Sequence, residues 1–404
     1  MNNYCVVDMK NIESIDVCFG CTACEVSCSG SCISMKPNEE GFLYPAVNSK
    51  SCKSCGMCLK VCPSYDNLDL KHKTQLAYAA YLDKKETYVN SSSGGIFAAC
   101  SSAIIQDGGV VVGTSMYSDY EVRHTIVTDL KDLHQIQGSK YVQSNLEGIF
   151  LKVVKLLKSN SLVLFSGTPC QVAGLLRFID CKKINTDQLF TIDIVCHGVP
   201  SPLFFKKHME TSYGEVTNIK FRHKTKHELS GYALGFDKDG KHTVITPTNK
   251  DFYFACYSSQ VSLRESCYRC PFACRERVGD ITLGDLATQK RYYDQLGVEH
   301  ACSIVAVNTE KEKNLFDKLQ GVVSVKADYD IEVMSNAQMS APTRRPKNRD
   351  TFYLDLFKDG KYDESNVLNY AYVDSKKEKF KQMIKSMTTP MFRYRLRKLE
   401  NIFH

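Results

Sequence analysis

The sequence has no apolar run long enough for a membrane-spanning helix and no recognisable secretion signal. A spanning helix requires roughly 18 or more consecutive apolar residues, and no stretch of the 404 residues reaches that length. Residues 1–15 lack a basic start followed by an apolar core, so no signal peptide is predicted. These absences exclude a membrane span from the interpretation and argue against a secreted protein held by disulfides.

Strong charge of either sign is also missing. The formal net charge is +7, with 24% charged and 43% hydrophobic residues, which is ordinary for a soluble globular protein. A charge this small for the length does not indicate a nucleic-acid partner. A mildly basic face that meets an acidic electron donor or an anionic cofactor is compatible with it. The length predicts two or three domains.

Tryptophan is absent, whereas cysteine is abundant, with 19 residues. So many thiols predict a reducing, low-oxygen cytoplasm, because exposed iron–sulfur clusters are readily oxidised. Outside the motifs described below, six cysteines are interpreted as small buried apolar residues. They are Cys5, Cys32, Cys100, Cys181, Cys256 and Cys302.

Two cysteine runs with identical spacing lie near the N-terminus. Each has the form C-x2-C-x2-C-x3-C, and Pro63 follows the second run, whereas Ser29 follows the first. This is the spacing of bacterial two-cluster ferredoxins, in which the fourth cysteine of a run ligates the other cluster. The sequence therefore predicts two 4Fe-4S clusters, one held by Cys18, Cys21, Cys24 and Cys62 and the other by Cys52, Cys55, Cys58 and Cys28.

Zinc and disulfides are the alternatives for these runs. A structural zinc site needs four ligands, and eight cysteines in two equal runs exceed that need. Small residues such as Gly20, Ala23 and Gly56 also leave backbone N–H groups near the sulfides of a cluster.

Three regions are predicted along the chain: a ferredoxin-like domain over residues 1–72, an α/β domain over 73–345 and a basic C-terminal extension over 346–404. In the second region, apolar strand-like segments alternate with helical segments, which predicts a parallel sheet with βαβ crossovers. The predicted strands cover residues 76–82, 109–113, 122–127, 161–165 and 189–195, and the predicted helices cover 96–105, 146–157, 172–179 and 202–213.

Several polar or reactive residues follow predicted strands, where α/β sheets bind ligands. A Ser-Gly-rich turn at residues 91–95 opens a helix, which suits a phosphate cradle or, equally, a plain N-cap. Cys170 lies at a helix N-terminus, which is expected to lower the pKa of its thiol. Cys196 and His197 follow the next strand, and His197 has a purely structural role as its alternative.

A third group of cysteines, Cys267, Cys270 and Cys274, lies between arginines. Three close cysteines with a remote fourth are typical of an additional iron–sulfur cluster, and either Cys170 or Cys196 would complete it. Zinc bound by the same residues is the alternative. Residues 376–398 are rich in lysine and arginine and are interpreted as a solvated helix on the body of the protein, with a membrane-surface or partner-docking helix as the alternative.

An ordered set of segments from about residue 76 to 345 resembles the coenzyme F-420 hydrogenase/dehydrogenase beta-subunit family, in the version fused to an N-terminal ferredoxin. The segments that carry the resemblance are residues 92–95, 139–144, 167–171, 196–202 and 267–285. One departure is that Leu286, Ala287 and Thr288 follow Gly284 and Asp285, where the family commonly has an aromatic pair and a glycine.

This resemblance implies a fold class of α+β and α/β: a bacterial-ferredoxin-like domain followed by a mixed α/β flavin-binding domain with an additional cluster loop. It implies an oxidoreductase that binds FAD and passes electrons from ferredoxin or a redox partner subunit to a small-molecule substrate or a deazaflavin. The alternatives are an electron-input subunit without its own substrate and a structural metal-binding protein. The implied third cluster has Cys170, Cys267, Cys270 and Cys274 as ligands, with Cys196 competing.

The resemblance also implies positions for the flavin site. Its phosphate is expected at Ser93, Gly94 and Gly95, and the rest of the flavin near Lys140, Gln143, Gly167 and Thr168. His197 is the predicted catalytic proton donor, because an unperturbed histidine titrates near neutrality.

Overall fold

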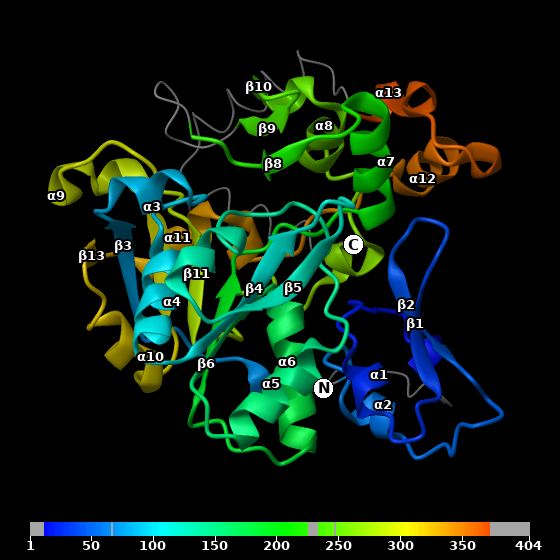
Figure 1. Cartoon of the computed structure of the whole chain (residues 1–404), viewed down its shortest axis with the longest axis horizontal. Helices are drawn as coiled ribbons and strands as arrows, with labels where there is room; N and C mark the ends of the chain where they lie inside the picture. Colours follow the sequence, from blue (N-terminus) through cyan, green and yellow to red (C-terminus); the bar gives the residue numbers. More distant parts are fainter. Residues whose placement is uncertain (1–11, 66–67, 225–232, 246–247, 372–404) are drawn as a thin grey trace.

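The computed structural model describes residues 12–65, 68–224, 233–245 and 248–371 (Figure 1). Cys5 and residues 376–398, for which the sequence made predictions, lie outside these ranges. Among the helices in the described ranges, none combines the length and apolar character that crossing a membrane requires.

An eight-stranded sheet forms the centre of the molecule, with strand order β13-β3-β12-β11-β7-β6-β4-β5. Its strands are β3 (Leu76–Leu82), β4 (Val110–Met116), β5 (Val122–Val127), β6 (Val163–Gly167), β7 (Leu189–Ile194), β11 (Ile281–Asp285), β12 (Ser303–Val307) and β13 (Val322–Lys326). Adjacent strands from β4 through β6 and β7 to β11 pair in parallel, whereas β5, β12, β3 and β13 pair antiparallel with their neighbours. The sheet is therefore mixed rather than purely parallel, because short connections such as β4 to β5 allow only antiparallel pairing.

Helices cover both faces of this sheet. On one face lie α4 (Ile96–Gln106) and α10 (Glu310–Phe316), and on the other α5 (Ile149–Lys158) and α6 (Pro169–Cys181). Side chains alternate along the strands, so Leu164 packs in the α4 cluster and Phe165 in the α6 cluster. Burial on both faces explains why these strands are continuously apolar in the sequence.

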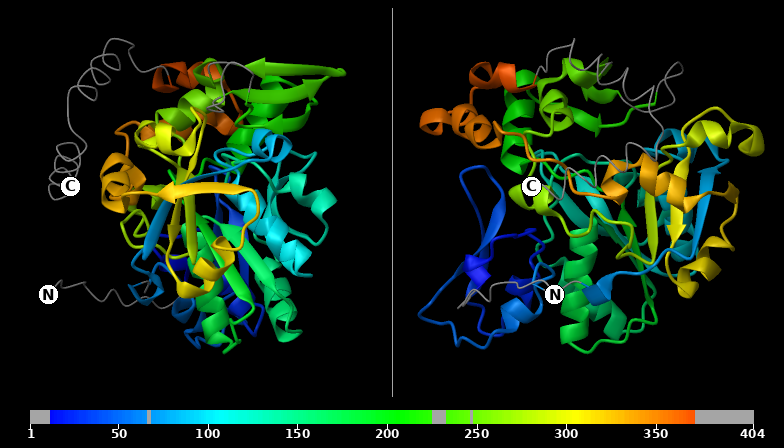
Figure 2. Two further views of the ribbon diagram at one scale, coloured as in Figure 1. Left: turned by 90° about the vertical axis from the view of Figure 1, so that its left-hand side faces the viewer. Right: turned by 180° about the vertical axis from the view of Figure 1, so that it is seen from behind.

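The N-terminal region packs beside α5 and α6 (Figures 1 and 2). It contains η1 (Ile12–Ser14), α1 (Ala23–Ser27), the hairpin β1 (Ile33–Pro37) and β2 (Leu43–Val47), α2 (Met57–Lys60) and η2 (Leu68–Leu70). The turn of the hairpin contacts the start of α7. Ser201 Oγ donates to the Glu40 carbonyl, and Gly41 packs so closely against Leu203 that a side chain at position 41 would not fit. Ion pairs from Arg269 to Asp16 and from Arg177 to Asp69 attach the region elsewhere.

An aromatic-rich layer covers one end of the main sheet (Figure 2). It contains α7 (Pro202–Ser212), α8 (Phe252–Ser258), α12 (Arg349–Leu356), η8 (Lys358–Gly360), η9 (Glu364–Val367), α13 (Leu368–Ala371) and the sheet of β8 (Thr217–Lys220), β9 (Leu234–Lys238) and β10 (Lys241–Ile245). Phe352, Tyr353 and Leu356 are buried in it, so the described start of the predicted C-terminal extension belongs to a core.

The remaining elements connect or flank the sheet. They are α3 (Lys85–Val89), η3 (Leu130–Gln135), η4 (Thr248–Lys250), η5 (Glu265–Arg269), η6 (Gln289–Arg291), α9 (Tyr293–Leu296), α11 (Tyr329–Ser335) and η7 (Ala337–Met339).

Candidate redox site

The first predicted ligand set gathers in the structure. Burial raises the pKa of Cys21, and the neighbouring Cys62, Cys24 and Cys18 raise it further. Cys62 comes from the second run, yet it lies with three cysteines of the first, as the crossed ferredoxin pattern predicts. Burial and the negative charge of neighbouring thiolates both disfavour ionisation of Cys21 and Cys24. The positively charged core of a 4Fe-4S cluster would let all four bind as thiolates, so this donor set fits such a cluster.

The second predicted set lies nearer the surface. Cys55 is exposed, and Cys28, Cys52 and Cys58 are half-buried. Cys32, which was interpreted as structural, lies with its sulfur 3.2 Å from that of Cys28, and Cys28 and Cys52 both contribute to raising its pKa, to about 11. The second set is therefore the more accessible of the two.

The two runs share a backbone conformation as well as a spacing. Gly20 and Thr22 flank the second cysteine of the first run with φ of 66° and 64°, and Ser54 and Gly56 do so in the second run with 51° and 70°. The left-handed residues turn N–H groups toward sulfur: Gly20 N lies 3.4 Å from Cys18 Sγ, and Ser54 N lies 3.5 Å from Cys52 Sγ. The conformational repeat supports one ligand geometry used twice.

A third set of cysteines lines a small cavity of about 40 Å³ in the α/β domain. Its sulfur-bearing residues are Cys170 at the start of α6, Cys196 after β7, and Cys267 and Cys270 in and after η5. Cys274 is not part of this lining, and its Sγ donates to the Glu276 carbonyl at 3.2 Å. The structure thus brings both candidate remote cysteines, Cys170 and Cys196, to the same cavity.

The local sequence explains how these cysteines are held. Thr168 caps α6 in a capping box with Gln171, and the Cys170 sulfur lies 3.2 Å from Thr168 Oγ1. Backbone N–H groups contact two more sulfurs, from Gly198 to Cys196 and from Val199 to Cys267, both at 3.4 Å. The expectation that the helix N-terminus would lower the pKa of Cys170 is wrong, because burial outweighs it and raises that pKa.

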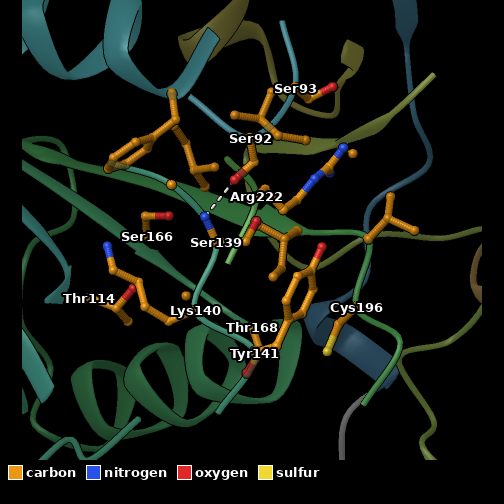
Figure 3. A pocket seen from close by; sticks show the side chains of 18 of the residues that line it. Ser92, Ser93, Thr114, Ser139, Lys140, Tyr141, Ser166, Thr168, Cys196 and Arg222 are labelled. Carbon is orange, nitrogen blue, oxygen red and sulfur yellow. Dashed lines mark hydrogen bonds between the residues drawn. The ribbon is translucent and has the colours of Figure 1, made fainter. Parts of the chain in front are cut away.

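A larger cavity of about 360 Å³ opens at the carboxyl ends of β6, β7 and β11 (Figure 3). Predicted residues that line it are Ser93, Gly95, Lys140, Gly167, Thr168 and His197. Gly94 does not, because it packs against β3 and β12: an added Cβ would lie 2.7 Å from Ser303 N. Gln143 lines the cysteine cavity instead.

Three further side chains at this cavity had no assigned role in the sequence. Arg222 Nη1 pairs with Asp285 at 2.7 Å, and Tyr257 forms another part of the wall. Asp285 ends β11, so its place at a strand end was a usable signal. Arg222 follows an irregular segment after β8, and no pattern in the sequence marks it.

Lys140 brings a partly buried cation to one side of the larger cavity, next to Thr114 in Figure 3. Its ammonium donates to the Gln137 carbonyl at 2.8 Å and the Gln135 carbonyl at 3.3 Å. Burial lowers its pKa to about 7. An anionic group in the cavity would offset this desolvation and favour the charged form.

The two cavities share a wall. Thr168, Cys196, His197 and Val199 line both of them, and Figure 3 shows Cys196 on the side away from Lys140. His197 is exposed where it lines the cavities, but the surrounding protein still removes part of its hydration. This loss of hydration lowers the pKa of His197, whereas the Asp285 carboxylate acts to raise it. A group in the larger cavity would therefore be separated from the cysteine cavity by few residues.

Residues 161–329 match the family model for the carboxyl-terminal part of the beta subunit of coenzyme F420 hydrogenase/dehydrogenase. This stretch, less than half of the chain, is similar to the F420 beta-subunit family. Residues 17–65 and, overlapping them, 51–103 match families described as "4Fe-4S dicluster domain". The second range continues into β3 and α4 of the main sheet. The chain is accordingly an iron–sulfur electron-transfer protein related to components of F420-dependent oxidoreductases.

Two curated relatives of the F420 beta-subunit domain show similarity over longer ranges. One of the subunits of the F(420)H(2) dehydrogenase of Methanosarcina mazei is 21% identical over 57% of this chain and 67% of its own length. The "Coenzyme F420-dependent sulfite reductase" of Methanocaldococcus jannaschii is 22% identical over 80% of this chain, but the match spans only 48% of that protein. A chain of the F420-reducing NiFe hydrogenase complex from Methanosarcina barkeri is similar with a TM-score of 0.44 and 15% identity, over 63% of this chain and 83% of that one.

Proposed function

We propose that the protein is an iron–sulfur flavoprotein oxidoreductase. Electrons from a reduced ferredoxin or a partner subunit enter at the exposed second cluster and pass to the first cluster. They continue to a third cluster in the cysteine cavity and then to FAD in the larger cavity. From there they reach a hydride-accepting small molecule or a deazaflavin.

The observation that carries this proposal is the close succession of sites. Gly174 lies one turn after Cys170 on α6, and a Cβ added to it would lie 2.8 Å from the sulfur of Cys21. The first cluster therefore packs against the helix whose first turn carries a ligand of the cysteine cavity. On the other side, Cys196 and His197 separate that cavity from the larger one.

For the third cluster we favour Cys170, Cys196, Cys267 and Cys270 as ligands. Each raises the pKa of at least one other member of the set by charge repulsion, and the cavity lining does not include Cys274. Within the described residues, no three His, Cys, Asp or Glu side chains converge closely enough for a single metal ion. The four sulfurs surround a cavity rather than a single point. This arrangement suits a cluster better than zinc, which would hold each sulfur about 2.3 Å from the metal.

The larger cavity has features that fit a flavin nucleotide. Ser92, Ser93 and Gly95 lie at the N-terminus of α4, where unpaired N–H groups favour phosphate. Lys140 adds a cation, while Ile96 and Ile194 add apolar surface. A bound flavin would supply the conversion between one-electron transfers and hydride transfer. His197 stands beside Cys196 and can hold or deliver a proton at its ring.

The proposal is tested by anaerobic reconstitution of the full chain with iron, sulfide and FAD. We expect about twelve iron ions for three 4Fe-4S clusters, one tightly bound FAD, and reduction of the FAD after one-electron donors are added. A preparation with full iron that does not retain FAD would contradict the proposal. Turnover of a deazaflavin by the isolated chain supports the enzyme, whereas turnover only after a partner reductase is added supports the electron-input subunit.

A further inference from the structure

Arg264 is a buried cation that lies between the N-terminal region and the cysteine cavity. Its residue exposure is 1%, and it lines the cysteine cavity. The guanidinium donates to the Cys18 carbonyl at 2.7 Å, to Leu43 O at 2.8 Å and to Gln143 Oε1 at 3.0 Å. All three acceptors are neutral, and they come from both domains.

Within the part of the chain that the structure describes, no carboxylate lies within ion-pair distance of Arg264. Two other arginines are equally buried, and both are paired: Arg349 contacts Glu40 at 2.7 Å, and Arg277 lies 3.6 Å from Asp193. A buried charge is costly unless an opposite charge balances it. Arg264 has three neutral acceptors and the ring of Tyr44, whose centre lies 4.3 Å from the guanidinium carbon, but no anionic partner among the described residues.

The anions that face Arg264 are the thiolates of the proposed third cluster. Arg264 lines the same small cavity as Cys170, Cys196, Cys267 and Cys270. A 4Fe-4S cluster with four thiolates is a net anion, and it gains one more negative charge on reduction. A fixed cation nearby therefore stabilises the reduced form more than the oxidised form, since cluster potentials respond to local charge.

Arg264 also joins the two cluster sites through bonds and hydrogen bonds alone. Its side chain contacts the backbone carbonyl of Cys18, a ligand of the first cluster. Its own carbonyl accepts from the backbone N–H of Cys267 at 2.9 Å. One residue thus spans the contact across which an electron would pass.

We infer that Arg264 is the counter-ion of the third cluster and a positioning residue for electron transfer into it. It raises the reduction potential of that cluster. This inference rests on the proposed function, because it requires that the cysteine cavity hold a cluster.

The test cancels the charge in two independent ways. Arg264→Gln removes the cation. Gln143→Glu places a carboxylate of similar shape against the same guanidinium. Arg264→Lys keeps the charge, Gln143→Met changes position 143 without adding charge, and Arg349→Gln removes a buried cation that Glu40 already balances. Each full-length protein is reconstituted, its iron is measured, and the third cluster is titrated anaerobically by electron paramagnetic resonance.

We expect Arg264→Gln and Gln143→Glu each to lower, at least tenfold, the equilibrium constant for reduction of the third cluster by a reference mediator. For a one-electron couple this is a shift of about 59 mV to more negative potential. Arg264→Lys, Gln143→Met and Arg349→Gln should shift it several-fold less. If Arg264→Gln does not retain the third cluster, the comparison of Gln143→Glu with Gln143→Met decides whether the charge of Arg264 sets the potential of that cluster.

A Gln143→Glu protein that titrates like Gln143→Met would overturn the inference and leave the proposed function standing. A wild-type protein that holds iron only in the N-terminal clusters would instead overturn the proposed function, whatever the variants show.

Discussion

The two cysteine-rich regions of this protein are built in different ways. In the N-terminal region, eight cysteines lie in two short runs, and each run repeats the same left-handed backbone residues around its second cysteine. In the α/β domain, the cysteine cavity is assembled from a helix N-terminus, a strand end and a loop that lies nearly 100 residues further on than Cys170. The first kind of site is encoded locally, whereas the second depends on the whole sheet.

This difference determines whether the ligands of a cluster can be identified from their spacing along the chain. A run supplies its ligands at fixed spacing, so proximity in sequence is a reliable guide there. In the assembled cavity proximity misleads, because Cys274 is near Cys270 in sequence but lies outside the lining, while the distant Cys196 lies within it.

The largest expected effect comes from Cys196→Ala, compared with Cys274→Ala as its matched control. We expect the Cys196 variant to lose about four of about twelve iron ions, because a cluster loses one of its four ligands. The Cys274 variant should keep its full iron content. Iron and sulfide analysis after anaerobic reconstitution measures both, and the opposite pattern would restore Cys274 as the ligand.

Gly174→Ala tests whether the locally encoded cluster also depends on the α/β domain. Alanine normally stabilises a helix by about 1 kcal/mol relative to glycine. Here the new Cβ would lie 2.8 Å from Cys21 Sγ, so we expect a loss of first-cluster iron and a lower melting temperature instead. Gly30→Ala is the control, since its nearest neighbour would be 3.8 Å away. A stabilised, fully loaded Gly174→Ala protein would show that the regions are independent.

His197→Gln separates proton transfer from electron transfer within the assembled region. General acid catalysis typically contributes about 100-fold or more, so turnover of a hydride acceptor should fall by about that factor. Reduction of a one-electron acceptor such as ferricyanide should stay near the wild-type rate. Equal loss with both acceptors would assign His197 a structural role.

Lys140→Met should have the smallest effect, on FAD affinity alone. A hydrogen bond from a charged group contributes about 1.5–3 kcal/mol, which is about tenfold or more in affinity. The pKa of Lys140 is lowered to about 7, so the wild-type ammonium loses its proton as pH rises through that value. Calorimetric titration should therefore show FAD binding weakening from pH 6 to pH 8 in the wild type and little change in the variant. The same pH dependence in both proteins would exclude Lys140.

The sequence predicted much of the sheet and six of the residues that line the larger cavity, for physical reasons that particular residues illustrate. Leu76–Leu82 and Val122–Val127 are strands as predicted, because apolar and β-branched runs report burial directly. Ser93 and Thr168 were identifiable because ligands bind where strands end. Gln143, in contrast, lies in the other cavity, since its neighbours in space come from the N-terminal region and from η5, which no local pattern reveals.

The attachment of the N-terminal hairpin to α7 has a consequence for kinetics. Contacts at the hairpin turn, through Glu40 and Gly41, and at Asp16 hold the N-terminal region against the body at two separate places. Transfer between the first cluster and the proposed third cluster then requires no encounter between moving domains. Solvent viscosity and ionic strength should act only on the arrival of an external electron donor, so the dependence of the overall rate on these two variables isolates the docking step from all internal ones.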